Sequence, residues 1–114
     1  MHEMSYVVRL VNQALEIKKE QAGKVTRLFV SVGEMTGVLP EYLYKYYPQA
    51  VEGTEIEGSE LVVETVEAQV ECAGCGGVYR PTRENKYLCP ACGDGHGRVI
   101  AGRDVRLERV EMDL

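Results

Sequence analysis

The sequence predicts an α+β protein, in which a small mixed three-stranded sheet and two helices form one unit that carries an inserted four-cysteine module. Two observations support this prediction. Helical and strand patterns alternate along the chain, and its four cysteines all lie in a Gly-rich stretch with few large apolar side chains. With 114 residues, the chain has room for one ordinary domain, or for a small domain with a metal-bound module.

The composition narrows the possible functions. The chain has 18 acidic and 13 basic residues, a formal net charge of −5, which argues against binding to nucleic-acid phosphates as the main activity. No apolar run is long enough to span a membrane, and the start MHEMSYVVRL lacks the basic and apolar regions of a signal peptide. We therefore expect a cytoplasmic protein, whose cysteines stay reduced and available for a metal.

Two segments have the pattern of helices. Residues 3–20 carry an apolar stripe at helical spacing that ends near Gly23. A second helix begins at Pro40 and Glu41, which suit a first turn, and runs to about Val51, with Pro48 expected to bend or shorten it. The stripe of the first helix, predicted to pack in the core, consists of Met4, Val7, Val8, Val11, Ala14 and Leu15.

The second helix also carries a group of tyrosines. Such a group can stack on a ring or a base, but it more often forms the amphipathic rim of a core, and we favour that interpretation. The tyrosines are Tyr42, Tyr44, Tyr46 and Tyr47.

Three strands are predicted. Residues 24–33 are rich in β-branched residues with apolar side chains on both parities, which predicts a strand covered on both faces. A second strand follows the polar loop EGTEIEGSE, and the last strand, DVRLERVEMDL, changes parity after Leu107, which indicates a bulge. We expect the last two strands to pair as an antiparallel ribbon whose far end carries the insert. The expected units are residues 1–71 with 99–114, and the insert 72–98.

The insert contains the pattern CAGC-x13-CPAC, with a glycine after each pair. Two cysteines three apart in a tight turn can bind one ion, and two such turns give the four-sulfur shell that structural zinc prefers. A disulfide is disfavoured by the reducing compartment, whereas an iron-bound shell stays open on sequence alone. Basic residues in and beside the insert leave contact with nucleic acid as a lesser alternative; they are Arg80, Arg83, Lys86, Arg98 and Arg103.

The N-terminus offers a second kind of metal site. A histidine at position 2 is usually unconstrained, but the Met1 amine, the His2 amide nitrogen and His2 Nδ1 can chelate one ion through fused rings. Such a nitrogen-rich set favours square-planar Ni(II) or Cu(II) over zinc. Glu3 can add its amide nitrogen or its carboxylate, or act from outside the ligand set.

Together these motifs resemble the HypA/HybF family of hydrogenase maturation factors. The resemblance covers essentially the whole chain through MHEMS, VSVGEMTGVLPE, AVEGTEIEGSEL, CAGCG…CPACG and GRDVRLERVEMD. It implies a nickel metallochaperone with a nickel-binding domain (1–71 with 99–114) and a zinc-binding domain (72–98). It assigns nickel to His2 and Glu3, and zinc to Cys72, Cys75, Cys89 and Cys92. The partners that it implies are a nickel-handling maturation GTPase and the hydrogenase large-subunit precursor, with urease served by some members.

The remaining histidine, His96, lies in the Gly-rich sequence GDGHGR after the last cysteine. Its plainer interpretation is an exposed loop residue, and the alternative is an extra nickel ligand if the two domains close on one another. We expect a carrier rather than an enzyme, because the sequence has no nucleophile elbow, HExxH motif or phosphate-binding Gly-rich loop. The competing hypotheses are a zinc-ribbon module that docks on nucleic acid or protein, and an iron-binding electron carrier.

Overall fold

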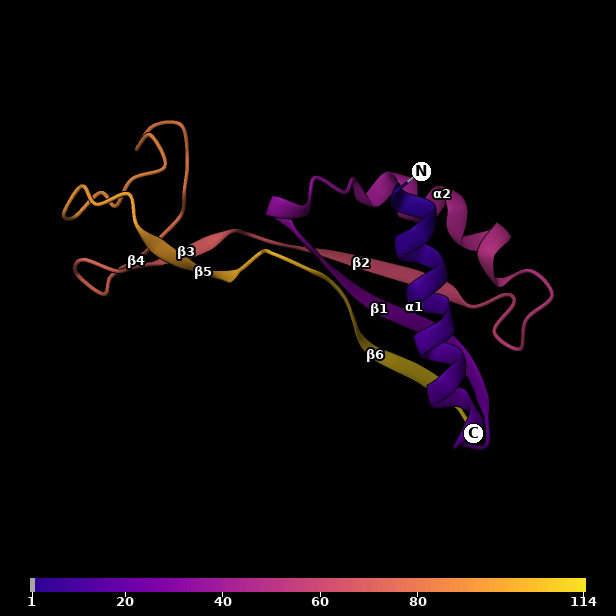
Figure 1. The fold of residues 1–114 in the computed structure, drawn as a ribbon. Coiled ribbons are helices and arrows are strands. Elements are labelled where there is room, and N and C mark those ends of the chain that lie inside the picture. Colours follow the sequence, from indigo (N-terminus) through magenta and orange to yellow (C-terminus); the bar gives the residue numbers. More distant parts are fainter. Residues whose placement is uncertain (1) are drawn as a thin grey trace.

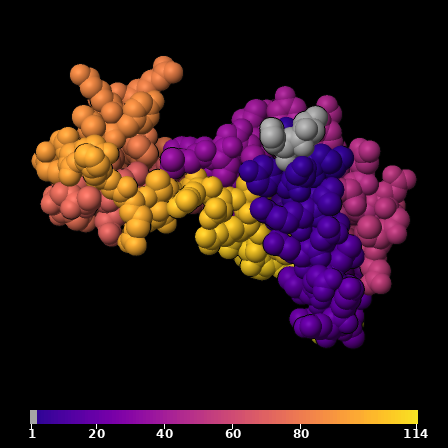
Figure 2. Space-filling view, viewed as in Figure 1, coloured from indigo at the N-terminus to yellow at the C-terminus, as the bar shows by residue number. Residues whose placement is uncertain are grey.

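A computed structural model describes residues 2–114, and the side chains from residue 3 onward. The chain folds into two parts joined by a narrow waist, within an elongated envelope of 52 × 27 × 16 Å (Figures 1 and 2). None of the described helices is long and apolar enough to cross a membrane. The elements, in order, are α1 (His2–Lys19), β1 (Lys24–Gly33), the 3₁₀ turn η1 (Glu34–Thr36), α2 (Pro40–Val51), β2 (Glu60–Val66), β3 (Gln69–Cys72), β4 (Val78–Tyr79), β5 (Gly97–Ala101) and β6 (Val105–Asp113).

The apolar stripe of α1 packs in the core, as the spacing predicts. Val7, Val11 and Ala14 are buried, together with Leu10, which the predicted stripe omitted. Val8 and Met4 are the exceptions: 44% of the surface of Val8 is exposed, and the partly exposed Met4 lies outside the core cluster. Each fully buried aliphatic side chain contributes about 1.5–3 kcal/mol, so the tertiary contacts of this face hold α1 in place.

The first sheet has the strand order β2-β1-β6, with β1 parallel to β2 and antiparallel to β6. The predicted pairing of the last two long strands is therefore wrong for this sheet, because β1 lies between them. The cause is α2, a crossover helix that returns the chain so that β2 runs parallel to β1. An antiparallel ribbon does form farther along the chain, where β3 pairs with β5, and this ribbon carries the insert in the second sheet, ordered β4-β3-β5.

The prediction that β1 is covered on both faces holds only for the end of the strand, where Val30 to Gly33 are all buried. Leu28, Val30 and Val32 are buried in the cluster that includes the helices, and Val25 joins the cluster because the register shifts at Thr26. The opposite parity carries polar groups and Phe29, whose ring lies 3.8 Å from the guanidinium carbon of Arg109. The two apolar residues that led to the prediction are therefore explained separately. The bulge at Thr26 turns Val25 toward the core, and Phe29 makes a cation–π contact with Arg109.

The bulge expected in the last strand is confirmed. Phe29 pairs with Arg109 and the next residue, Val30, pairs with Leu107, so Glu108 is the extra residue. Its carboxylate accepts a hydrogen bond of 2.6 Å from the hydroxyl of Ser31, a buried polar side chain. The bulge therefore gives that hydroxyl a partner, as a buried polar group requires.

Helix α2 begins at Pro40 and continues through Pro48 to Val51, the full predicted length. Its tyrosines form the rim of the core. Tyr47 is buried, with its hydroxyl 2.6 Å from Ser59 Oγ, and burial raises its pKa above the usual value. Tyr44 is more exposed, and its hydroxyl accepts a 2.8 Å hydrogen bond from the backbone N–H of Val63 in β2.

Three backbone segments meet at the waist, at Gly33, Ala68 and Gly102. A Cβ atom on Gly33 would lie 2.3 Å from the carbonyl carbon of Gly102, and one on Gly102 (φ +82°) would lie 2.6 Å from Cα of Ala68. The Glu34 carboxylate then accepts hydrogen bonds from the Ala68 N–H (3.3 Å) and from the Arg80 guanidinium (2.7 Å). The two sheets are thus joined by the close approach of the Gly33 and Gly102 backbones, which the lack of a side chain permits, and by the carboxylate of Glu34.

Candidate metal centres

The four cysteines come together at the end of the second sheet. Cys72 ends β3, Cys75 lies in the following turn, and Cys89 and Cys92 lie in the loop before β5. The four sulfur atoms lie within 4.8 Å of one another, with Cys72 and Cys92 separated by 3.4 Å and Cys75 and Cys89 by 3.6 Å. These distances leave all four cysteines free rather than disulfide-bonded.

The two CxxC pairs form matching turns. The N–H of Gly76 donates to the carbonyl of Cys72 at 3.0 Å, and the N–H of Gly93 donates to the carbonyl of Cys89 at 2.7 Å. The two glycines have φ of +76° and +77°, the left-handed conformation that a side chain disfavours. The glycine that follows each CxxC pair is thus required by the reversal of the chain, as the sequence predicts.

Backbone N–H groups in these turns point at the sulfur atoms. Gly74 donates to Cys72 Sγ at 3.3 Å, and the sulfur of Cys75 accepts from Gly77. In the second turn, Cys89 accepts from Ala91, and Cys92 accepts from Asp94. Each sulfur therefore accepts from the residue two positions later, an arrangement that stabilises a thiolate.

The thiols also affect one another. Hydrogen bonds from the Cys92 and Ala91 N–H groups lower the pKa of Cys89 to about 7. The Asp94 N–H favours the Cys92 thiolate, but the neighbouring thiols, Cys72 foremost, raise the pKa of Cys92 to about 12. Four thiolates this close repel one another, so a cation is needed for all of them to ionise together.

This geometry fits zinc. A tetrahedral ion with bonds of about 2.3 Å to sulfur requires sulfur atoms roughly 3.8 Å apart, close to the two separations above. All four positions of the shell are filled by protein sulfurs, which is the pattern of a structural site. Cys72 and Cys89 are buried, whereas Cys75 and Cys92 are exposed, so the bound ion would lie at the surface of the module and hold its two loops together.

The predicted N-terminal site lies mostly outside the part of the chain that the structure describes. Met1 and the side chain of His2 fall outside it. Helix α1 begins at His2, and Glu3 is a partly exposed acidic residue in its first turn. The first four N–H groups of a helix have no acceptor within the helix, so the amide nitrogens of His2 and Glu3 are not needed for hydrogen bonds inside α1.

His96 is 90% exposed and lies in the loop before β5. Its Nδ1 is 2.9 Å from Oδ1 of Asp94, which also accepts the backbone N–H of His96, and these hydrogen bonds lower the pKa of the Asp94 carboxyl. The fold does not bring His96 to the start of α1, because β5 belongs to the opposite part of the molecule (Figure 1). Sequence reasoning missed Asp94, although an aspartate two residues before a histidine in a Gly-rich turn is a recognisable signal.

Comparison with known proteins identifies the family of this chain. Residues 1–112 match the profile of a family described as HypA, hydrogenase/urease nickel incorporation, metallochaperone. The chain belongs to the HypA family. The hydrogenase maturation factor HypA of Caldanaerobacter subterraneus subsp. tengcongensis is 38% identical over 99% of this chain and all of that protein. The HypA of Aquifex aeolicus is 33% identical over the whole of this chain and 99% of its own.

Solved structures of HypA proteins share the fold. The solution structure of the nickel metallochaperone HypA from Helicobacter pylori superposes with a TM-score of 0.72 at 25% identity, covering 96% of both chains. A second HypA solution structure gives a TM-score of 0.75 at 26% identity, over 98% of this chain and 96% of that one. The predicted α+β class, with two helices, small mixed sheets and a metal-binding cysteine cluster, is thus confirmed.

Proposed function

We propose that this chain binds Ni(II) at its N-terminus and delivers it during maturation of a [NiFe]-hydrogenase, with zinc as a structural ion in the cysteine cluster. The observation that carries the proposal is the family match over residues 1–112. It includes the Met-His-Glu start as well as both CxxC pairs. The chain then acts as a carrier, and any nucleotide hydrolysis that the process needs is done by a partner.

The proposed nickel ligands are the Met1 amine, the His2 amide nitrogen, the His2 imidazole and a contribution from Glu3. Helix α1 begins at His2, so deprotonation of these first amides costs no hydrogen bond within the helix. All of these groups must lose or lack protons before they bind, so nickel affinity should fall as the pH is lowered. A site at a chain end is open to attack by the ligands of an acceptor, which permits release by stepwise ligand exchange.

The assignment of the two metals to two domains keeps the bounds expected from the sequence, although the second sheet itself begins at Gln69 and ends at Ala101. We assign nickel binding to residues 1–71 with 99–114, and zinc binding to residues 72–98. His96 is proposed as an additional nickel ligand when the zinc-binding part approaches the start of α1. Its contact with Asp94 at Nδ1 supports this role, because a histidine oriented by a carboxylate on one nitrogen presents the other nitrogen to a metal.

The proposed partners are a nickel-handling maturation GTPase and the hydrogenase large-subunit precursor, all in the cytoplasm. The alternative of a zinc-ribbon module that binds nucleic acid is not favoured by the family match. In addition, two of the five basic residues in and beside the insert already have acidic partners, since Arg80 pairs with Glu34 and Glu67, and Arg98 pairs with Glu71.

The test is elemental analysis and Ni(II) titration of untagged protein. We expect one zinc retained per chain and one nickel bound, with the nickel lost in His2→Ala and in a variant that carries a short extension before Met1. His96→Ala is the informative partner variant, because it should keep nickel in the isolated protein but slow its transfer. Unchanged nickel affinity in both N-terminal variants would show that the assigned site is wrong. A red sample that contains iron would instead support the electron-carrier hypothesis.

A further inference from the structure

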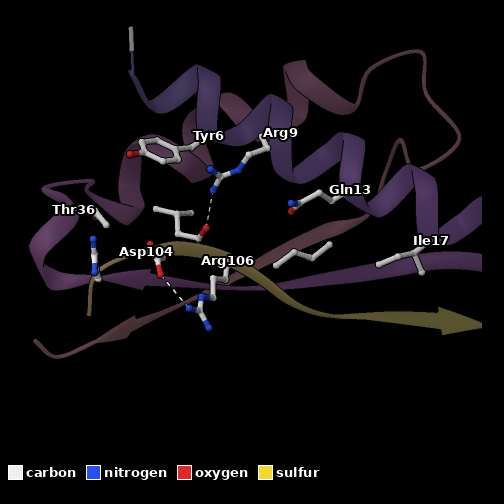
Figure 3. Close-up of a pocket in the computed structure, with 10 residues that line it drawn as sticks. Tyr6, Arg9, Gln13, Ile17, Thr36, Asp104 and Arg106 are labelled. Atoms are coloured by element: carbon white, nitrogen blue, oxygen red, sulfur yellow. Dashed lines mark hydrogen bonds and ion pairs between the residues drawn. The ribbon is translucent and has the colours of Figure 1, made fainter. Parts of the chain in front are cut away.

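Most of the described basic side chains already have a partner. In the groove between α1 and β6, Arg9 donates to the carbonyl of Val105 at 2.6 Å, and Arg106 pairs with Asp104 at 3.0 Å (Figure 3). Others form ion pairs with acidic side chains or lie over aromatic rings. Within residues 3–114, the basic side chains with no such contact are Lys24, Arg83, Lys86 and Arg103.

Arg83 and Lys86 lie together in residues 82–88, a segment between the two CxxC pairs that we call the tip. The tip belongs to the end of the molecule opposite the start of α1, and Figure 2 shows orange residues of this region projecting from the zinc-binding part. Both cations are exposed, as are Tyr87 (57%) and Leu88. The tip has Glu84 as its one acidic residue, so it is basic on a chain with a formal charge of −5.

The backbone of the tip has an uncommon conformation. Lys86 and Tyr87 have φ of +54° and +62°, and among the described residues they are the ones other than glycine with positive φ. The N–H of Leu88 donates to the carbonyl of Asn85 at 2.9 Å, which makes residues 85–88 a type I′ turn. The central positions of such a turn favour Asn, Asp and Gly. Lys86 and Tyr87 are therefore displayed at a cost to the local backbone, which is a feature of functional sites.

The side chain of Asn85 fixes this turn. Its Oδ1 accepts hydrogen bonds from the N–H groups of Thr82 (3.1 Å) and Tyr87 (3.0 Å), and its Nδ2 donates to the carbonyl of Arg80 at 2.8 Å. The tip then leads directly into Cys89, a buried member of the cysteine cluster. Because these contacts order the tip in advance, little conformational entropy is lost when a partner binds it.

We propose that the tip docks on an acidic surface of a partner protein, with Tyr87 and Leu88 in an apolar hollow and with Arg83 and Lys86 against carboxylates around it. Aromatic anchors supply much of the energy of protein interfaces, and charges at the rim speed association. A nucleic acid fits less well, because two unpaired cations neutralise few phosphates and the acidic chain repels the rest. Identifying the partner as the donor or the acceptor of nickel rests on the proposed function, whereas the docking itself does not.

The experiment uses the full zinc-loaded chain and a dodecapeptide that repeats Glu-Glu-Leu. The same peptide with Lys in place of Glu is the charge control, and an oligouridylate of equal length is the nucleic-acid probe. Binding is measured by fluorescence anisotropy of the labelled probes and by the backbone amide NMR signals of the protein. We expect the Glu-Glu-Leu peptide to shift the signals of residues 82–88, with an affinity that falls as the salt concentration is raised.

The matched variants make the same change of charge at different places. Arg83→Glu with Lys86→Glu should weaken peptide binding by about tenfold or more. Lys24→Glu with Arg103→Glu replaces the other two unpaired cations and should leave binding within about twofold. Elemental analysis should show that all of these variants, whose changed residues are exposed, retain their zinc.

A further variant separates display of the side chains from support of the loop. Lys86→Asn with Tyr87→Gly installs the preferred sequence of a type I′ turn, so it should slow hydrogen exchange of the Leu88 N–H while weakening peptide binding by about tenfold or more. His2→Ala should keep peptide binding while losing nickel, so failure of the nickel assignment and failure of this proposal are distinguishable. Absence of shifts in residues 82–88 at millimolar peptide, tighter binding of the oligouridylate, or equal losses in the two charge variants would each overturn the proposal.

Discussion

The zinc-binding part should depend on its metal for folding, while the rest of the protein should not. Within residues 73–96, all of them described by the structure, Cys89 is the single buried residue. The buried apolar cluster of the first part draws no member from this range; its nearest members in sequence are Leu61 and Val105. Ordering so many residues costs tens of kcal/mol of conformational entropy, and one buried side chain cannot offset that cost.

The metal can supply the missing free energy. Structural zinc contributes roughly 10–16 kcal/mol in small zinc-dependent domains at neutral pH. If only about 4 kcal/mol of this holds the loops closed, its removal opens them about a thousandfold more often, since 1.4 kcal/mol corresponds to a factor of ten. Chelation should therefore raise amide hydrogen exchange in residues 73–96 by at least about a thousandfold, with β1 amides unchanged.

The assay is hydrogen exchange, measured by NMR, on zinc-loaded and chelator-treated protein. Cys75→Ser should reproduce the effect of the chelator, because it removes one ligand from the exposed side of the cluster. Ala73→Ser, an exposed residue in the same turn, is the matched control and should exchange like the parent chain. Protected amides in residues 73–96 after complete removal of zinc would refute this reasoning, as would loss of protection in β1.

Three further predictions concern stability, each measured by urea denaturation. Leu43→Ala removes a fully buried side chain and should lower the free energy of unfolding by about 2–5 kcal/mol. Val8→Ala, on the exposed face of α1, should change it by less than about 0.5 kcal/mol. Equal effects of the two substitutions would contradict the assignment of the core. Gly102→Ala should cost more than Gly53→Ala, because both have positive φ but only Gly102 has backbone within 2.6 Å of the added carbon; equal losses would show that the backbones at the waist move apart freely. The pKa of Tyr47 is raised in the folded protein, so the unfolded state releases this proton at lower pH and stability should fall above about pH 10. The decline should be smaller in Tyr47→Phe. An identical decline in that variant would rule out Tyr47 as its source.

The two helices and the long strands β1 and β6 were predictable from local pattern. The predicted second strand instead divides into β2 and β3, which belong to different sheets, and the short strands β4 and β5 were not predicted. Lys24–Gly33 and Pro40–Val51 begin and end where composition, proline and glycine indicate. Strand pairing was not predictable in the same way, because it depends on which strand the crossover helix packs against. The bulge at Thr26 explains another error, since Val25 and Leu28 lie on opposite parities in the sequence but in the same buried cluster.

The cysteine cluster was predictable because its chemistry is fixed by residue type and short spacing. Two matching turns with a glycine after each pair can hardly form anything other than one four-sulfur site. The tip of the zinc-binding part gives a weaker signal. Its basic residues Arg83 and Lys86 stand out in the sequence, but its turn does not, because Lys86 and Tyr87 occupy positions where Asn and Gly are usual.

The waist has a mechanical consequence. The chain passes between the two sheets only twice within residues 24–113, once near Ala68 and once near Gly102. Beyond these two crossings, a pair of exposed ion pairs from one guanidinium, that of Arg80, tethers the sheets at Glu34 and Glu67. Exposed pairs of this kind hold weakly, so a rotation at the crossing would be opposed mainly by the close backbone contacts of Gly33, Gly102 and Ala68. Even a small rotation there would be amplified into a wide displacement at the distal end of the molecule.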